Sequence, residues 1–375
     1  MTDLQKTRAE VDEIDRQIAE LFEKRMRLTE DIAEFKLQHG VRVVDPEREE
    51  EMYRELRGMA SSEFNAMGIQ EVLKQIISIS RKRQYQIQTE NGLTEDLGFE
   101  EIDEVYKNKK VVFQGVEGAY GYAAMLEYFG DDVNCFHVAT FKEAIEAIVN
   151  KEANFAVLPI ENSTAGIVTD MYDLLMSYDI TIVDEHTLKV EHKLLGLPGT
   201  KLSDIRSVYS HPQALSQCKP YLEQHEEWIQ KEYTNTAAAC KKISDDGDPT
   251  QAAIGSEYAA RLYGLEILAE NIHYDNNNST RFIIVSRNKM FRSDARRVSI
   301  CFNTRHSQGS LYNILSHIIY NQLNMTLIES RPIPDSPWEY RFFVDFEGNL
   351  NDSAVKNALR GIRHDAMDLR ILGNY

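Results

Sequence analysis

The sequence has few cysteines, no long apolar run and less positive than negative charge. Its four cysteines are scattered over 375 residues, and no two stand at the spacing of a metal site or a redox motif. No apolar stretch approaches the ~20 residues that cross a bilayer. A net charge of −18 argues against general binding to nucleic acids or anionic membranes, but it does not exclude small anionic ligands.

The start of the chain carries no targeting pattern. Met1-Thr2-Asp3 leads directly into a charged helical pattern, so we expect no signal peptide. Together with the scattered cysteines, this predicts a soluble protein of the reducing cytoplasm. The length and an apolar content of 42% are sufficient for two or three domains with cores of their own.

Residues 1–90 are predicted to be wholly helical, and the first helix, over about residues 3–38, follows a heptad pattern. Its apolar seam has two series, which are Leu4, Val11, Ile18 and Ile32, and Ile14, Leu21, Leu28 and Phe35. Arg25 stands in the first series, where an aliphatic residue is expected. A helix roughly 50 Å long, at ~1.5 Å per residue, is suited to packing against partners. The seam cation either fixes the oligomeric state or binds an anion.

The two following helices add polar residues that could complete an anion site. Gly40 is predicted to end the first helix, and Asp45-Pro46 to begin the second. Ser80 and Gln84 lie four residues apart on one face of the third helix. A pocket of four cations, one acceptor and one neutral donor would contain Arg8, Arg25, Lys36, Arg48, Glu49 and Gln84. Such a pocket could bind a small dicarboxylate and stabilise charge, with little scope for covalent chemistry.

The polar and acidic stretch 91–108 is predicted to be a linker, and residues 109–290 have a different pattern. Short strand runs there alternate with helical stretches, which predicts a mostly parallel sheet covered on both faces. Ligands of such sheets bind in the loops at the carboxyl ends of strands. Four motifs occupy such places: Gly115–Tyr120, Pro159–Ser163, Ser210–Gln213 and Asn278–Phe282.

Residues 297–375 have a third pattern, with elements in the order β-α-β-β-α-β. The predicted strands are Val298–Phe302, Thr326–Ile328, Arg341–Phe346 and Leu369–Leu372, and the predicted helices are Ser310–Leu323 and Ser353–His364. This order is the split-βαβ, ferredoxin-like α+β sandwich. Domains of this kind are often regulatory, but the fold alone does not prove a function.

The helical segment resembles the chorismate mutase domain at the front of bifunctional enzymes of aromatic biosynthesis. The family's polar site positions fall on Arg8, Arg25, Lys36, Asp45, Arg48, Glu49, Ser80 and Gln84. The resemblance implies an intertwined all-α dimer in which Arg8 reaches the partner's site, and a rearrangement of chorismate to prephenate. Arg25 and Arg8 would bind the two carboxylates, and Lys36 and Gln84 would donate hydrogen bonds to the ether oxygen. Lys36, Gln84 and Glu49 are the expected catalytic residues of this site.

The middle segment resembles prephenate dehydratase over about residues 109–290, and Thr280-Arg281-Phe282 is its most specific motif. The resemblance implies a bilobal α/β fold like that of periplasmic binding proteins, and the loss of water and CO2 from prephenate to give phenylpyruvate. Thr280 would be the catalytic proton donor, and the residues around the substrate would be Asn162, Ser163, Ser210, Gln217 and Arg281. Arg281 is expected to clamp a carboxylate, because its planar fork binds bidentately.

Some residues of this segment depart from the family pattern or receive no catalytic role. Gly121 stands where the family has serine or threonine, so a hydroxyl contact is absent there. His211, beside Pro212, is expected to be structural, and His186 and His192 are given no role.

The final segment resembles the amino-acid-binding ACT domain, in which phenylalanine binds. The implied effector residues are Gly309, Ser310, Leu311, Glu329, Ser330 and Arg331. Tyr312 departs from the first motif, which has an aliphatic residue at that position. A helix N-terminus beside glycine suits a carboxylate, and Glu329 could hold an ammonium group.

The sequence therefore predicts a bifunctional enzyme of phenylalanine biosynthesis that is inhibited by phenylalanine. It is expected to need no cofactor or metal and to form a homodimer or a larger homo-oligomer. One alternative is a dehydratase whose helical domain only dimerises. Another is a small-molecule sensor without turnover, against which Thr280 and the complete cation set argue. Both alternatives predict that chorismate is not converted to prephenate faster than the uncatalysed rate.

Overall fold

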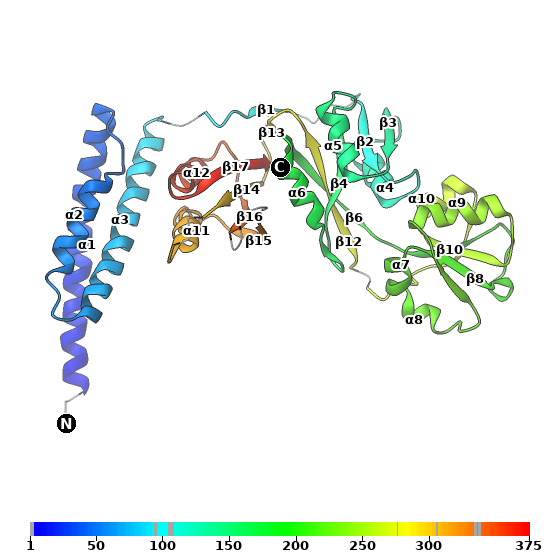
Figure 1. The fold of residues 1–375 in the computed structure, drawn as a ribbon, viewed down its shortest axis with the longest axis horizontal. Coiled ribbons are helices and arrows are strands. Elements are labelled where there is room, and N and C mark those ends of the chain that lie inside the picture. The colour runs from blue at the N-terminus through cyan, green and yellow to red at the C-terminus, as the bar shows by residue number, and fades with distance from the viewer. Residues whose placement is uncertain are drawn as a thin grey trace. The chain divides into compact units, whose positions relative to one another are not determined.

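The computed structural model describes residues 4–93, 96–103, 109–275, 277–304, 307–333, 336 and 339–375 (Figure 1). Parts of the predicted linker, residues 94–95 and 104–108, lie outside the described residues. The chain divides into two compact units. One combines Met1–Leu97 with Arg296–Ile371, and the other combines Gly98–Ala295 with Leu372–Tyr375.

The first unit begins with three helices, α1 (Leu4–His39), α2 (Pro46–Arg57) and α3 (Glu63–Glu90). Helices α2 and α3 begin at N-capping side chains: Asp45 accepts a hydrogen bond from Arg48 N, and Ser62 accepts one from Asn65 N. Helix α1 packs along α3, and α2 packs against α3 as well. The wholly helical character predicted for residues 1–90 is therefore observed in the described part of that segment.

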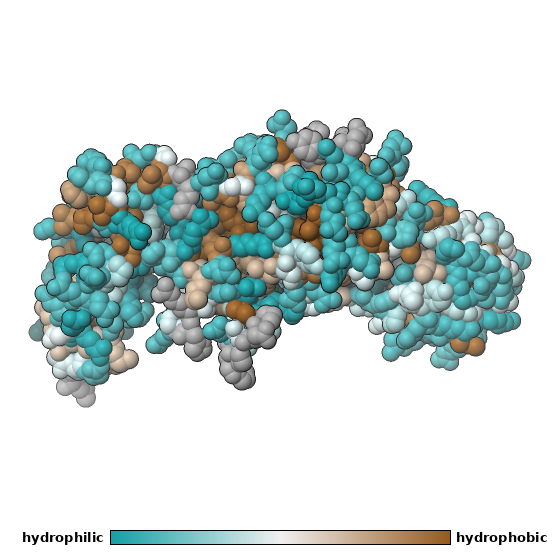
Figure 2. Space-filling view, turned by 45° about the horizontal axis from the view of Figure 1, so that its top comes forward, coloured by the Kyte–Doolittle hydropathy of each residue, from teal (hydrophilic) through white to brown (hydrophobic). Residues whose placement is uncertain are grey.

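The apolar seam of α1 is uncovered in the single chain. The side chains predicted for it, Leu4, Val11, Ile14, Ile18, Leu21, Leu28, Ile32 and Phe35, are 49–66% exposed. The space-filling view shows hydrophobic residues at the surface of this helical part (Figure 2). Within α1 only Thr29 and Ala33 are buried. A stripe of this length is larger than the scattered apolar residues that monomer surfaces normally carry.

The C-terminal segment, which belongs to the first unit up to Ile371, has the predicted order β-α-β-β-α-β. Its elements are β14 (Arg297–Asn303), α11 (Ser310–Tyr320), β15 (Met325–Pro332), β16 (Tyr340–Glu347), α12 (Ser353–Asp365) and β17 (Met367–Asn374). The strands are neighbours in the order β15-β16-β14-β17, and β16 is antiparallel to both β14 and β15. Helices α11 and α12 pack on each other, and both contact α3.

The second unit contains two separate sheets. The first has the order β6-β12-β4-β2-β3, and its strands are β2 (Val111–Gln114), β3 (Cys135–Val138), β4 (Phe155–Asn162), β6 (Thr181–Lys189) and β12 (Ser279–Ser286). Short strand β5 (Gly166–Ile167) pairs with β4, and β1 (Glu100–Ile102) pairs with β13 (Met290–Arg292). Its helices are α4 (Tyr120–Phe129), α5 (Phe141–Val149) and α6 (Thr169–Ser177).

The second sheet of this unit has the order β11-β7-β10-β8-β9. Its strands are β7 (Lys193–Gly196), β8 (Ser207–Ser210), β9 (Ile229–Glu232), β10 (Gln251–Gly255) and β11 (Glu266–Ala269). Its helices are η1 (Leu202–Asp204), α7 (Pro212–Gln217), α8 (Lys219–Leu222), α9 (Thr236–Asp246) and α10 (Glu257–Tyr263). Each sheet has a core of its own, around Phe113 and Val157 in the first and around Val208 and Ile254 in the second.

Both sheets are mixed, which corrects the prediction of a mostly parallel sheet. Strand β2 is parallel to β3 and β4, but β12 is antiparallel to β4 and β6. In the second sheet β8 is parallel to β9 and β10, whereas β7 is antiparallel to β10 and β11. The cause is the chain path: the chain leaves the first sheet after β6 and returns as β12, between β6 and β4.

None of the described helices is long and apolar enough to span a bilayer.

Candidate functional site

Arg25 and Ser80 bring α1 and α3 together at the predicted anion pocket. Arg25 Nη1 donates to Ser80 Oγ, and Ser80 Oγ donates in turn to Ile76 O at 2.8 Å. Ser80 is buried, and burial lowers the pKa of the Arg25 guanidinium from its ordinary value. A partly desolvated cation with a neutral partner is stabilised when an anion joins it. This pair therefore favours an anionic ligand.

Lys36, near the end of α1, points back over the loop that leads to α2. Its Nζ donates to Val43 O at 2.6 Å. Burial lowers the pKa of Lys36, while the nearby carboxylates of Asp45 and Glu49 act in the opposite direction. Asp45 itself serves as the N-cap of α2 through a 3.1 Å bond from Arg48 N. Lys36 and Asp45 thus lie in one local charge environment.

Glu49 is engaged by a residue outside the predicted set, Arg81. The guanidinium binds both carboxylate oxygens, with 2.9 Å from Nε to Oε1. Arg81 stands in the run Arg81-Lys82-Arg83, directly after Ser80. Nothing in that run shows which cation faces α2, because the choice depends on how α2 packs on α3.

Gln84 lies one turn after Ser80 and is 7% exposed. Its Oε1 atom is buried and has no hydrogen-bond partner among the residues that the structure describes. Buried polar atoms are normally paired, so an unpaired amide suits a ligand that completes the hydrogen bonding. Oxygen and nitrogen of such an amide exchange by a simple flip, so the group can also donate.

The structure does not bring Arg8 and Arg48 into this cluster. Arg48 is 65% exposed, and its Nη1 pairs with Glu51 at 2.8 Å. Arg8 is exposed on α1 and precedes Arg25 by 17 residues (25 − 8), which is roughly 25 Å at ~1.5 Å per residue. Within one chain, Arg8 and Arg25 therefore cannot bind the same small molecule, and the cross-chain role of Arg8 stays a prediction.

The second unit contains a 320 Å³ cavity that is lined from both of its sheets. The first sheet and its loops supply Asn162, Asn278 and Thr280, and the second supplies His211 and Gln217. Thr280 and Asn162 are paired in register on β12 and β4. Three motifs that are far apart in the sequence thus meet at one cavity.

Asn162 fixes the hydroxyl of Thr280. Its Nδ2 donates to Thr280 Oγ1 at 2.9 Å and to Asn278 Oδ1 at 2.9 Å. Its Oδ1 accepts from the backbone of Thr164 and Ala165, so the amide orientation is defined by contacts on both sides. Because Thr280 Oγ1 accepts from Asn162, the hydroxyl proton of Thr280 is available for another acceptor.

Gln217 is oriented by His192, which sequence reasoning left without a role. His192 Nε2 lies 2.8 Å from Gln217 Oε1, and its Nδ1 lies 2.9 Å from the Tyr120 hydroxyl. Burial lowers the pKa of His192 to about 4, so the ring is neutral at physiological pH. A neutral ring that donates from Nε2 accepts at Nδ1, which fits a hydroxyl donor. Nothing in the local sequence shows that His192 faces this cavity.

His211 has a structural role at the start of α7, as predicted. Its Nδ1 accepts from Gln213 N at 3.2 Å, in the position of an N-cap. The same side chain also lines the 320 Å³ cavity.

Ser163, Ser210 and Arg281 are not among the residues that line this cavity. Ser163 Oγ bonds to the backbone of residues 277 and 279, and the fully buried Ser210 donates to Ile254 O at 2.8 Å. Arg281 lies between Glu161 and Glu185, at 3.1 Å from each. Successive residues of a strand point to opposite faces, so Thr280 faces the cavity and Arg281 does not. Arg281 is thus an ion-pair residue here, which corrects the expected carboxylate clamp.

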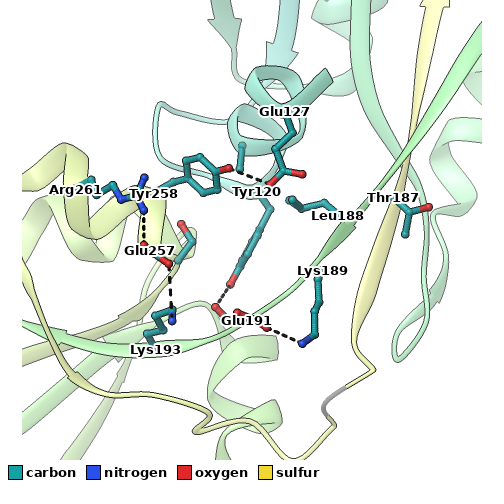
Figure 3. A pocket seen from close by; sticks show the side chains of 12 residues that line it. Tyr120, Glu127, Thr187, Leu188, Lys189, Glu191, Lys193, Glu257, Tyr258 and Arg261 are labelled. Atoms are coloured by element: carbon teal, nitrogen blue, oxygen red, sulfur yellow. Dashed lines mark hydrogen bonds and ion pairs between the residues drawn. The ribbon is translucent and has the colours of Figure 1, made fainter. Parts of the chain in front are cut away.

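A neighbouring cavity of 430 Å³ shares Tyr120 with the first (Figure 3). Each of its three cations, Lys189, Lys193 and Arg261, is paired with a glutamate of the same cavity, as the dashed lines show. Lys189 pairs with Glu191 at 2.6 Å, and Glu257 pairs with Arg261 at 2.5 Å and with Lys193 at 3.9 Å. This internal compensation makes the second cavity a weaker candidate for an anionic substrate.

The predicted effector residues lie on α11 and β15. Gly309 has φ +78° before the first turn of α11, a left-handed conformation that favours glycine. Ser310 Oγ donates to Ser307 O at 2.9 Å, and Gly309, Ser310 and Leu311 line one cavity. Glu329 and Arg331 are half-buried on β15, and Ser330 is exposed.

Among the described residues, no group of three or more acidic, histidine or cysteine side chains could hold a metal ion.

Two family models match the chain over these two sites. The chorismate mutase type II model matches residues 7–85, and the prephenate dehydratase model matches residues 111–290. The bifunctional chorismate mutase/prephenate dehydratase of Buchnera aphidicola subsp. Acyrthosiphon pisum is 31% identical, over 98% of this chain and 95% of its own length. The similarity therefore spans the helical segment, the middle segment and the C-terminal segment of the chain.

Two solved structures resemble the chain over 71% of its length. One is prephenate dehydratase from Arthrobacter aurescens in complex with L-Phe, with 30% identity, a TM-score of 0.65 and 89% of that chain covered. The other is GqqA, described as a novel type of quorum quenching acylase, with 32% identity, a TM-score of 0.66 and 97% covered.

The match to full-length bifunctional relatives agrees with the two separate groups of polar residues, one on α1–α3 and one between the sheets of the second unit. The chain is an isomerase and a lyase of aromatic amino-acid biosynthesis. It belongs to the bifunctional chorismate mutase/prephenate dehydratase family.

Proposed function

We propose that the mutase reaction takes place at Arg25, Lys36, Glu49, Ser80 and Gln84. The observation that carries this proposal is that these residues come from three packed helices and that two of them, Arg25 and Gln84, have polar groups to which a ligand could supply a partner. Burial lowers the pKa of Arg25, and Gln84 Oε1 is unpaired among the described residues. A substrate with carboxylate, hydroxyl and ether oxygens would compensate both.

The rearrangement needs charge stabilisation and positioning, with no covalent intermediate. Arg25 binds one carboxylate, and Arg8 of a second copy binds the other. Lys36 and Gln84 donate to the ether oxygen as its bond to carbon breaks and negative charge develops there. Glu49 accepts from the substrate hydroxyl. The site holds the substrate's side chain over the substrate's ring, so that a compact conformer that is rare in solution becomes the bound one.

We propose a homodimer formed through α1 as the assembly that completes this site. The exposed apolar seam supports the proposal, because burying such side chains contributes roughly 1.5–3 kcal/mol for each large one. The distance along α1 between Arg8 and Arg25 also supports it, because Arg8 is too far from Arg25 of its own chain to bind the same substrate.

We propose Thr280 as the proton donor of the dehydratase reaction, in a bilobal unit whose substrate binds between the two sheets. The ring hydroxyl leaves with the proton of Thr280 as water. The carboxylate leaves as CO2, and the electron pair of its broken C–C bond completes the aromatic ring. Asn162 orients Thr280, and Gln217 donates its amide to the substrate. Ser163 and Ser210 do not line the cavity and act indirectly, through their bonds to the backbone of Asn277, Ser279 and Ile254.

We propose that the C-terminal segment is an ACT domain that binds phenylalanine and inhibits the dehydratase. Its strand order, with Gly309 at the start of α11 and Glu329 on the edge strand β15, supports this assignment. The complex of the Arthrobacter aurescens enzyme with L-Phe supports the choice of effector. Ser310, Leu311, Ser330 and Arg331 complete the proposed effector set.

We propose domain limits of 1–90, 91–108, 109–290 and 297–375, which the matched ranges 7–85 and 111–290 support. We propose the cytoplasm as the compartment, because Cys218, Cys240 and Cys301 are buried free thiols.

A binding experiment tests the mutase assignment without depending on turnover. A stable dicarboxylate that imitates the compact transition state is titrated calorimetrically into the full chain. It should bind tightly to the wild type and at least about tenfold more weakly to Arg25→Ala. Arg16→Ala, an exposed cation that pairs with Glu13 on the same helix, is the matched control. Equal affinity of the wild type and Arg25→Ala would contradict the assignment.

A further inference from the structure

The carboxylate of Glu49 is held in a fixed plane by Arg81. Nε donates to Oε1 at 2.9 Å and Nη2 donates to Oε2, so the contact is bidentate. The side chains of Arg81 and Glu49 are only 22% and 16% exposed, so water screens this pair less than a surface pair. A planar guanidinium fork sets the orientation of a carboxylate as well as its position, which a lysine does not.

The third nitrogen of Arg81 faces the C-terminal segment of the same unit. Arg81 Nη1 lies 3.9 Å from Asp365 Oδ1 at the end of α12. The other oxygen of Asp365, Oδ2, lies 2.8 Å from His317 Nε2 on α11. Burial alone would raise the pKa of Asp365, but the hydrogen bond to His317 and the charge of Arg81 lower it below its ordinary value. Asp365 is therefore an anion shared by a histidine and an arginine.

Packing around this anion fixes α11 and α12 against α3. Lys82, the residue after Arg81, donates through Nζ to Ser316 Oγ at 2.7 Å and lies 4.7 Å from the centre of the Tyr320 ring. A Cβ at Gly361 would collide with the ring of His317, so the glycine allows α12 to approach α11. The carboxylate of Asp365 is thus presented by two helices that pack closely on each other.

We propose that Arg81 is a positioning residue of the mutase site and that Asp365 and His317 of the C-terminal segment hold it in place. The inference rests on the role of Glu49 proposed above. Arg81 touches no substrate; it sets the plane in which the Glu49 carboxylate meets the substrate hydroxyl. The C-terminal segment thereby contributes to the first reaction as well as to effector binding.

A shared cavity of 410 Å³ supports this connection. Glu49, Tyr53 and Arg81 line it from the helices, and Ser310 lines it from the first turn of α11. Ser310 belongs to the predicted effector motif. The surroundings of the Glu49–Arg81 pair are thus continuous with the first turn of α11 and with Asp365 on α12.

The test measures mutase kinetics in the full chain, with the dehydratase rate of the same preparation as a control for folding. Arg81→Ala should lower the mutase kcat about tenfold, with a smaller change in KM, because positioning matters most in the transition state. Arg81→Lys should restore only part of the rate, since it keeps the charge and loses the fork. Asp365→Asn should lower kcat about threefold without a change in dehydratase rate.

A double-mutant cycle separates positioning from general destabilisation. Arg81→Ala should cause no further loss in a Glu49→Gln background, because a positioning residue acts only through the group that it holds. Arg83→Lys is the matched control: Arg83 stands two residues later on α3 and pairs with Glu30 and Glu90. It should leave the mutase rate unchanged.

Each of three results would overturn the inference. They are additive losses in the cycle, a parallel fall of the dehydratase rate in Arg81→Ala, or an unchanged mutase rate in Asp365→Asn. If Glu49→Gln itself keeps full mutase activity, the proposed role of Glu49 fails, and the positioning role fails with it. If Glu49→Gln is impaired but Arg81→Ala is not, only the positioning role is overturned.

Discussion

Asn162 donates to the hydroxyl of Thr280 across the β4–β12 pair, at 2.9 Å. A threonine hydroxyl is a poor acid in water, so its contribution depends on being fixed beside the leaving group in a shielded cavity. The bond from Asn162 supplies the fixed geometry and leaves the proton of Thr280 free to be donated. Because both residues lie on paired strands, small movements of the loops do not separate them.

Thr280→Val keeps the shape of the side chain and removes the proton. The dehydratase kcat should fall at least about tenfold, which corresponds to about 1.4 kcal/mol of barrier. Steady-state production of phenylpyruvate from prephenate measures this. Thr164→Val, in which the lost hydroxyl had bonded to Asp275, is the matched control and should stay close to the wild type. Full activity of Thr280→Val would remove Thr280 from its role.

Lys36→Ala should abolish mutase activity and spare dehydratase activity, because the two sites lie in different units of the chain. Both rates are measured on one preparation, with chorismate and prephenate supplied separately. Lys24→Ala, an exposed lysine of the same helix, serves as the control. An equal loss of both activities in Lys36→Ala would show that the sites are not independent.

Phenylalanine should inhibit the dehydratase, and Ser330→Ala should raise the inhibitory concentration at least about tenfold, equivalent to about 1.4 kcal/mol of effector binding. The exposed Ser330 lies on β15 between Glu329 and Arg331. Inhibition curves at fixed prephenate measure the effect, and Thr326→Ser on the same strand is the control. Unchanged inhibition would place the effector site elsewhere.

His192 should make the dehydratase unit less stable in mild acid. Burial holds its folded-state pKa near 4, below the ordinary value of 6.5, so the unfolded chain binds more protons between those pH values. The stability that depends on neutral His192 is complete above about pH 6.5 and is lost as the pH falls toward 4. Urea midpoints at about pH 7.5 and pH 5 should therefore differ more in the wild type than in His192→Gln. Equal differences would contradict a buried neutral His192.

Local patterns predicted much of the fold. The heptad series gave α1, Asp45-Pro46 gave the start of α2, and the element order of residues 297–375 was correct. These features depend on residues close together in the chain. The directions of β12 and β7 were not predictable in this way, because they depend on where the chain crosses between the two sheets.

The same distinction applies to the candidate sites. Thr280, Asn162 and Gln217 meet at one cavity as expected, because each lies in a motif at the end of a strand or in the helix that follows one. Arg281 could have been excluded from that cavity by the two-residue period of a strand. Arg81 and His192 could not have been found, since their roles depend on which helix or lobe packs opposite them.

The most direct test of the bifunctional account is the product that the purified chain forms from chorismate alone. The reaction runs at neutral pH against a heat-inactivated control, because prephenate decomposes to phenylpyruvate unaided in acid. If the chain carries both activities, prephenate appears as an intermediate and phenylpyruvate forms well above the control. Chorismate that remains unreacted would contradict the mutase assignment, and prephenate that accumulates without phenylpyruvate would contradict the assignment of the Thr280 cavity.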